Sequence, residues 1–172
     1  LTILLLPGSR GEAVHNLAMM LSILERIKVK HSIEFMVALS SSFQLEQLKQ
    51  VVDHLPWIVK KQDDQWLFQH TRYPVSVRVS YSFFDALHVS SVVIGLAGTA
   101  NEQAMHAKRQ LISFIGTGPQ STKKRFLQQH QLLSDVNPIF IDSNDPNFIS
   151  KKLSDILNQR TFNWTPLSDH YQ

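Results

Sequence analysis

The sequence of 172 residues contains no cysteine, which excludes a disulfide framework and metal sites built from thiolates. Its apolar runs are all shorter than the ~18 residues that a membrane-spanning helix needs. The first residues lack the basic segment that precedes the apolar stretch of a signal peptide. Together these absences favour a cytoplasmic protein with an ordinary globular core.

Several patterns of catalytic and nucleotide-binding proteins are also missing. The chain has no GxxxxGK[ST] phosphate loop and no GxGxxG followed by a ribose-binding acid, and its eight histidines form no HExxH pair. The segment PGSRG around Ser9 differs from the G-x-S-x-G pattern of a nucleophile elbow. Each histidine is therefore predicted to be a surface or core residue, and no metal site is expected.

Charge of either sign is sparse, and the net charge of +3 is small. The basic residues are dispersed in small groups, which is typical of a solvated surface, so nucleic-acid binding is not expected. The mild excess of positive charge leaves contact with an anionic membrane surface open. The groups are Lys60 and Lys61, Lys123 to Arg125, and Lys151 and Lys152.

Two similar corners are the main positive feature of the sequence. In residues 2–12 (TILLLPGSRGE) and 92–103 (VVIGLAGTANEQ), an apolar strand passes through glycines into the start of a helix. A helix N-terminus presents unpaired N–H groups and the positive end of the helix dipole, which together bind anions. Two such corners in a small domain indicate a ligand with more than one phosphate. The glycines are Gly8 and Gly11 in the first corner and Gly95 and Gly98 in the second.

Polar residues in both corners fit helix capping, phosphate binding, or both. Ser9 with Glu12, and Thr99 with Glu102, have the spacing of a capping box. Arg10 lies among the glycines of the first corner, where a guanidinium can clamp a phosphate in a fork. Capping alone would account for the two glutamates without any ligand, and Arg10 would then be a solvated loop residue.

Apolar residues elsewhere recur at helical spacing or in short runs, so helices and strands are expected to alternate. This alternation predicts an α/β protein with a Rossmann-like, doubly wound parallel sheet in one domain, residues 1–172, with an irregular tail at 160–172. In such sheets ligands bind beyond the carboxyl ends of the strands, where both corners lie. Further strands are expected at 33–39, 66–69, 75–79, 111–115 and 139–141, with a polar turn at 62–65, and helices at 12–28, 40–56, 82–88, 121–133 and 146–158.

The corners resemble a known family. Residues 4–10 (LLLPGSR) with Glu12, followed by Gly98, Thr99 and Ala100, resemble the nucleotide-sugar half of lipid-A-disaccharide synthase, a glycosyltransferase of the GT-B fold. Residues 97–104 (AGTANEQA), with 118–122 (GPQST) and Phe126-x-x-Gln129, are closer still to the lipid-A-disaccharide synthase-related proteins of cyanobacteria. The resemblance covers nearly the whole chain in order, and it implies the C-terminal, donor-binding domain of such an enzyme.

The resemblance also implies a ligand, a UDP-sugar, and roles for residues of the corners. Gly8, Ser9 and Arg10 would face the diphosphate in the first corner, and Gly98, Thr99 and Ala100 would face it in the second. The ribose and sugar would be held by Asn101, by Glu102 or Gln103, and by Gln120. Tyr81, at the end of an expected strand, is a candidate for contact with the base.

Sugar transfer by such a domain would require neither cofactor nor metal, because a helix dipole and Arg10 would stabilise the leaving diphosphate. In the GT-B fold the acceptor site and the general base belong to an N-terminal domain, for which this chain has no room. The chain also begins at Leu1 without an initiator methionine, as expected of a fragment, a processed chain or a domain of a longer protein. Binding with little turnover is therefore expected, the alternatives being a UDP-sugar epimerase and a non-catalytic nucleotide-sugar-binding or interaction module.

Overall fold

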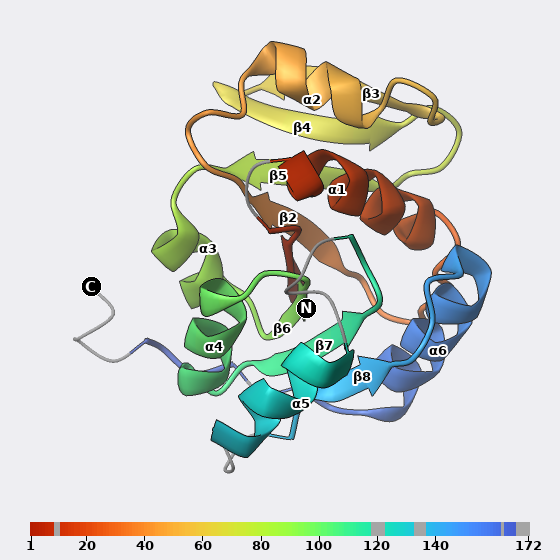
Figure 1. The fold of residues 1–172 in the computed structure, drawn as a ribbon. Helices are drawn as coiled ribbons and strands as arrows, with labels where there is room; N and C mark the ends of the chain where they lie inside the picture. Colours follow the sequence, from red (N-terminus) through yellow and green to blue (C-terminus); the bar gives the residue numbers. More distant parts are fainter. Residues whose placement is uncertain (9–10, 118–122, 133–136, 163, 168–172) are drawn as a thin grey trace.

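Eight strands form one sheet in the computed structural model of the chain, and helices cover both of its faces (Figure 1). The structure describes residues 1–8, 11–117, 123–132, 137–162 and 164–167. The strands follow the order β3-β4-β5-β2-β1-β6-β7-β8 across the sheet. They are β1 Thr2–Leu6, β2 Glu34–Ala38, β3 Trp57–Gln62, β4 Gln65–His70, β5 Ser76–Ser80, β6 Val92–Gly95, β7 Gln110–Phe114 and β8 Ile139–Ile141. The helices are α1 Gly11–Leu24, α2 Leu45–Val51, α3 Phe83–Val89, α4 Thr99–His106, α5 Lys123–Leu132 and α6 Pro146–Gln159.

The alternation of strands and helices predicted from the sequence is confirmed, and the sheet is mostly parallel. From β5 through β2, β1, β6 and β7 to β8, every neighbouring pair of strands is parallel. Side chains along β1 alternate between the two faces of the sheet. Ile3 and Leu5 belong to the core under α1, α2 and α6, whereas Leu4 and Leu6 belong to the core under α3, α4 and α5. Burial on both faces explains why this strand is apolar throughout.

One end of the sheet departs from the all-parallel expectation. The strand β3, which the sequence did not predict, pairs antiparallel with β4, and β4 pairs antiparallel with β5. The predicted turn at 62–65 is confirmed, with Asp63 and Asp64 both at positive φ, 52° and 62°, as a two-residue hairpin turn requires. Three of the six residues of β3 are Lys60, Lys61 and Gln62, all exposed, so the strand lacked the apolar signal of the others.

Several helix boundaries also follow local hydrogen bonds that the apolar pattern did not reveal. The helix α1 ends at Leu24 rather than at residue 28, because Arg26 N bonds to Ile23 O in a tighter final turn. The helix α2 begins after Gln44, whose N–H donates to Gln47 Oε1 at 2.9 Å, and not at residue 40. The start of α6 at Pro146, with Asp145 as its cap, is confirmed. No helix in the described part of the chain is long and apolar enough to cross a membrane.

The described part of the C-terminal tail, residues 160–162 and 164–167, contains neither helix nor strand, as expected. It packs against the face formed by α3 and α4. Leu167 is buried in the core of that face, and Trp164 Nε1 donates to the carbonyl oxygen of His88. The tail is irregular in backbone but attached to the fold.

Candidate functional site

The two glycine corners lie next to each other at one edge of the sheet. The strands β1 and β6 are parallel neighbours, with Leu6 opposite Gly95, so the loops that follow both strands leave the sheet at its C-terminal edge. Leu96 N donates to Leu6 O at 2.8 Å, which extends the pairing one residue beyond β6. The chain leaves β1 toward β2 on one side and returns to β6 on the other. This reversal is the topological switch point at which open α/β sheets bind their ligands.

The first corner requires glycine for its backbone conformation. Gly8 has a φ of +96°, in the region that favours glycine. A Cβ built on it would lie 3.8 Å from the carbonyl oxygen of Leu96, which shows how closely the first corner approaches the second. The helix α1 begins at Gly11. Ser9 and Arg10 lie outside the described residues, and so does the predicted capping box of Ser9 with Glu12.

The second corner starts its helix one residue earlier than predicted. Gly98 is the N-cap of α4, without a side-chain capping bond, and Thr99 is the first helical residue. The predicted capping box of Thr99 with Glu102 is therefore wrong, because this register places Asn101, not Glu102, at the third helical position. Thr99 is exposed, and Ala100, Glu102 and Gln103 are partly exposed on the first turns of the helix. The helices α1 and α4 approach the edge from opposite faces of the sheet.

Asn101 lies inside the molecule, below the second corner. Only 1% of its surface is exposed, and its Nδ2 donates to Gly95 O at 3.2 Å. Ser113 Oγ donates to the same carbonyl oxygen at 2.6 Å. This burial turns the Asn101 side chain away from solvent, and its Oδ1 has no hydrogen-bond partner among the described residues. The predicted contact with ribose or sugar would require the side chain to leave this position. The predicted roles of Glu102 and Gln103 are compatible with their exposure.

A third corner, which follows β7, is joined to the first corner by a residue that sequence reasoning missed. Asn16 of α1 donates from Nδ2 to Pro7 O at 2.9 Å and accepts from Thr117 N at 2.8 Å. The helical spacing of the sequence already placed Asn16 on the buried face of α1, because it lies three residues after Ala13 and four before Met20, both buried. A polar residue on the buried face of a helix needs a partner inside the fold. Gln120, predicted to lie near the sugar, falls in residues 118–122, which are outside the described residues.

Tyr81, the candidate for base contact, follows β5 at the same edge. Its hydroxyl donates to the carbonyl oxygen of Phe43, in the segment after β2. Partial burial raises the pKa of Tyr81 above its ordinary value. The hydroxyl thus connects two neighbouring strand ends, while Tyr81 as a whole is 43% exposed.

The raised pKa predicts how Tyr81 affects stability at alkaline pH. The folded state holds the phenolic proton more tightly than the unfolded state does. The contribution of the hydroxyl to the free energy of unfolding is therefore complete below about pH 10 and is lost at higher pH. We expect Tyr81→Phe to lower the free energy of unfolding by about 1 kcal/mol at pH 8, and this difference from the wild type should shrink above pH 10. Urea unfolding of both proteins between pH 8 and 11 measures it; a difference that grows with pH would contradict the prediction.

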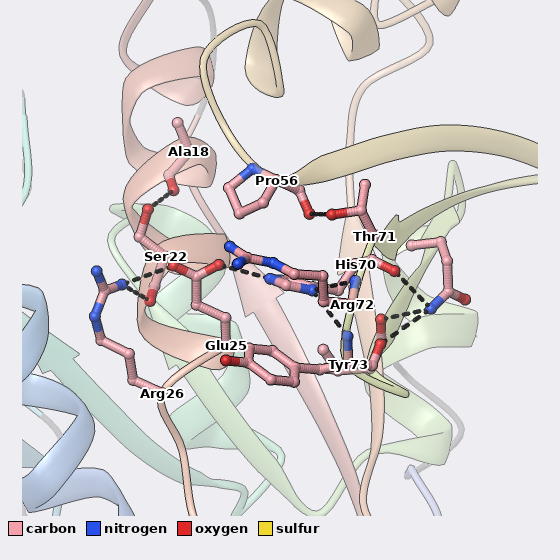
Figure 2. Close-up of polar contacts among 11 residues, drawn as sticks. Ala18, Ser22, Glu25, Arg26, Pro56, His70, Thr71, Arg72 and Tyr73 are labelled. Atoms are coloured by element: carbon pink, nitrogen blue, oxygen red, sulfur yellow. Dashed lines mark hydrogen bonds and ion pairs between the residues drawn. The ribbon is translucent and has the colours of Figure 1, made fainter.

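A second polar cluster surrounds a buried histidine at the opposite edge of the sheet, between the end of α1 and the loop after β4 (Figure 2). His70 is 3% exposed, and its Nδ1 accepts from the N–H groups of Arg72 and Tyr73, at 3.0 Å each. Nε2 therefore carries the proton and donates to Glu25 Oε2 at 2.9 Å. The ring also stacks on Tyr73 and meets Trp57 edge-on. With both nitrogens bonded inside the fold, His70 is a structural residue of the core.

A cavity of about 420 Å³ lies along β2, β4 and β5, and its lining runs from the beginnings of β2 and β5 to the turn between β3 and β4. Its wall includes Glu34 and Arg78, whose ion pair spans 3.5 Å. No described residue of the glycine corners lines it. The cavity is therefore separate from the candidate site. Its lining residues are Ile33, Glu34, Phe35, Gln62, Asp63, Gln65, Leu67, Pro74, Val75, Ser76 and Arg78.

The described part of the candidate site thus consists mainly of backbone groups, glycines and helix N-termini. No cluster of three or more metal-ligating side chains occurs among the residues that the structure describes. Such an arrangement can hold an anion by hydrogen bonds and helix dipoles. Comparisons of the chain with protein-family models, with curated proteins and with solved structures found no match.

Proposed function

We propose that this chain is the donor-binding domain of a glycosyltransferase that resembles lipid-A-disaccharide synthase, and that it binds the diphosphate of a UDP-sugar at the corners after β1 and β6. The observation that carries the proposal is the position of these corners on neighbouring parallel strands, joined by the bond from Leu96 N to Leu6 O. Glycine-containing turns that lead into helices at a switch point are the common phosphate site of α/β proteins.

The charge of the diphosphate would be balanced by the protein alone. The N-termini of α1 and α4 reach the edge from opposite faces, so a diphosphate between them would meet the positive ends of two helix dipoles. Thr99 and Ala100 belong to the first turn of α4, whose N–H groups have no carbonyl partner within the helix. Arg10 would add a fork of donors. As charge develops on the leaving UDP, these fixed groups would stabilise it in place of a metal ion.

The reaction would be transfer of a hexosamine-type sugar to a lipid or glycan acceptor. Its general base and acceptor site would come from an N-terminal domain of the GT-B fold, so the chain by itself should bind UDP-sugars with little turnover. A cytoplasmic location with contact to the membrane surface would suit a lipid acceptor and the mild positive charge.

UDP is expected to raise the melting temperature of the chain. At a UDP concentration of ~100 times the dissociation constant, the free energy of unfolding should increase by about 2.7 kcal/mol. Arg10→Ala should remove most of this increase and leave the melting temperature without ligand nearly unchanged. The matched control is Arg72→Ala, an exposed arginine at the opposite edge of the sheet, which should keep the full response. Differential scanning fluorimetry with a UDP titration measures all three proteins.

Each outcome distinguishes the proposal from its alternatives. No response of the wild type at millimolar UDP would contradict the proposed site. A UDP response accompanied by a free epimer from UDP-N-acetylglucosamine would indicate an epimerase instead. Transfer to an acceptor after addition of an N-terminal GT-B domain would support the transferase.

A further inference from the structure

The side chain of Asn16 is almost fully buried and has every hydrogen-bonding group satisfied. It is 2% exposed. Its Nδ2 donates to Pro7 O at 2.9 Å and to Thr117 O at 3.1 Å, and its Oδ1 accepts from Thr117 N at 2.8 Å. The amide therefore pairs with the peptide groups of Thr117 as a neighbouring strand would, and with one carbonyl of the first corner as well.

These bonds join two corners that are separated by a strand. Pro7 follows β1 and Thr117 follows β7, and β6 lies between these strands in the sheet. Asn16 reaches both corners from α1, so it spans the end of β6 on that helix's face of the sheet. The position of Gly8 confirms the proximity, because a Cβ built on it would lie 3.9 Å from Asn16 Nδ2.

An amide at this position is a costly choice for stability alone. The neighbouring buried positions of α1, Ala13, Leu17 and Met20, are apolar. Burial of an amide is unfavourable unless its bonds are made, and the net gain from each neutral bond is small. An apolar side chain would fill the core but could not fix the distance between the two corners. What Asn16 adds is therefore a defined geometry at the C-terminal edge of the sheet.

We propose that Asn16 is a positioning residue that holds the corners after β1 and β7 as one unit and thereby sets the spacing of the ligand-binding groups on either side of β6. The part that concerns the ligand rests on the proposed function, whereas the coupling of the corners does not. Fixing these loops before the ligand arrives reduces the entropy lost on binding. It also extends the site from two corners to three, so that a ligand on the β1 corner is held at a defined distance from the β7 corner.

The chain contains a similar but less buried arrangement that serves as a control. Asn158 of α6 donates from Nδ2 to Lys28 O at 3.0 Å and accepts at Oδ1 from Lys30 N at 2.9 Å. It therefore makes the same two-way bond between an amide and the backbone, but in the segment before β2, remote from the glycine corners. Asn158→Leu should change stability as a structural amide does, without an effect on the corners.

The first arm of the experiment needs no ligand. In Asn16→Leu, the order parameters of both the Gly8 and the Thr117 amides should fall from about 0.85 to below about 0.6 in ¹⁵N relaxation measurements. Asn158→Leu should leave both values unchanged. If Asn16→Leu does not fold, Asn16→Ala, which adds no bulk, is measured in its place. Unchanged order at Gly8 would overturn the coupling.

The second arm is calorimetric titration with UDP. Asn16→Leu should bind UDP at least about tenfold more weakly than the wild type, equivalent to the loss of one or two hydrogen bonds of positioning, and Asn158→Leu should bind as the wild type does. If the wild type does not bind UDP, the proposed function is contradicted, and the coupling of the two corners is then decided by the relaxation measurements alone. A wild type and an Asn16→Leu variant that bind UDP equally well would overturn the positioning role and leave the proposed function intact.

Discussion

Replacement of Arg109 by methionine is expected to lower the free energy of unfolding by about 3–5 kcal/mol. Arg109 precedes β7 and is only 1% exposed. Its Nε donates to Leu87 O at 3.2 Å and its Nη2 donates to His88 O at 3.2 Å, both near the C-terminal end of α3. Its Nη1 donates to Ala107 O at 3.3 Å and to Thr165 Oγ1 at 2.9 Å. One guanidinium thus joins a helix end, a turn and the C-terminal tail.

The expected loss is large because the arginine has oxygen partners on three segments. Methionine fills part of the volume but makes none of the four hydrogen bonds of the guanidinium, and a hydrogen bond from a charged donor contributes about 1.5–3 kcal/mol before the structure relaxes. Leu87 O and His88 O keep only their bonds from Ser90 and Trp164. Burial lowers the pKa of Arg109 from its ordinary value, but a guanidinium in a protein stays charged at neutral pH. The positive charge near the C-terminal end of α3 therefore also interacts favourably with the negative end of that helix dipole.

Urea unfolding at pH 7 measures this prediction, with Arg78→Met as its control. Arg78 forms an ion pair with Glu34 at 3.5 Å, and the two side chains are 45% and 72% exposed. An exposed pair of this kind contributes at most about 1 kcal/mol. If Arg109→Met lost no more stability than Arg78→Met, the hydrogen bonds of Arg109 would have no structural importance.

Replacement of Gly95 by alanine is expected to lower the free energy of unfolding by about 3 kcal/mol. The reason is space. A Cβ at Gly95 would lie 2.0 Å from Asn101 Oδ1 and 2.9 Å from Asn101 Cγ. The amide of Asn101 would be forced away from Gly95 O and would stay buried without its acceptor.

A double-mutant cycle separates this clash from any other effect of the alanine. With Asn101→Ala already present, the new methyl group has room, so Gly95→Ala should then cost less than about 1 kcal/mol. Gly11→Ala is the matched control, because a Cβ there meets nothing within 4 Å. That change should be neutral or stabilise by about 0.4–1 kcal/mol. Equal losses from Gly95→Ala in the presence and absence of Asn101 would exclude the clash as the cause.

The sequence predicted the fold well because the parallel strands carry their own signal. Runs such as TILLL and VVIG are buried on both faces, and all six glycines lie in the three corners at residues 8–11, 95–98 and 116–118. The exposed polar half of β3 gave no such signal. The start of α4 was misplaced by one residue because both Gly98 and Thr99 are acceptable N-caps.

The residues that organise the candidate site were harder to predict. Asn16 bonds to a peptide group 101 residues away. Arg109, outside the site, likewise bonds to Thr165, 56 residues away. Contacts of this range leave no pattern in a short stretch of sequence. Asn101 was assigned to the ribose or sugar through the family resemblance, and the sequence did not reveal that only 1% of its surface is exposed. The corners could thus be found from local sequence, but the side chains that hold them could not.

The central place of β1 in the sheet also affects how the chain can assemble. This strand precedes the other seven strands of the sheet in the sequence, yet one of its neighbours, β6, begins only at Val92. Until that segment emerges from the ribosome, one edge of β1 has no partner, and Leu4 and Leu6 lack the helices that later cover them. Nascent chains shorter than this carry an open, apolar strand edge, the kind of surface that chaperones shield and that favours aggregation. The same reversal of strand order that creates the ligand edge therefore delays pairing at the second edge of β1 until β6 has been synthesised.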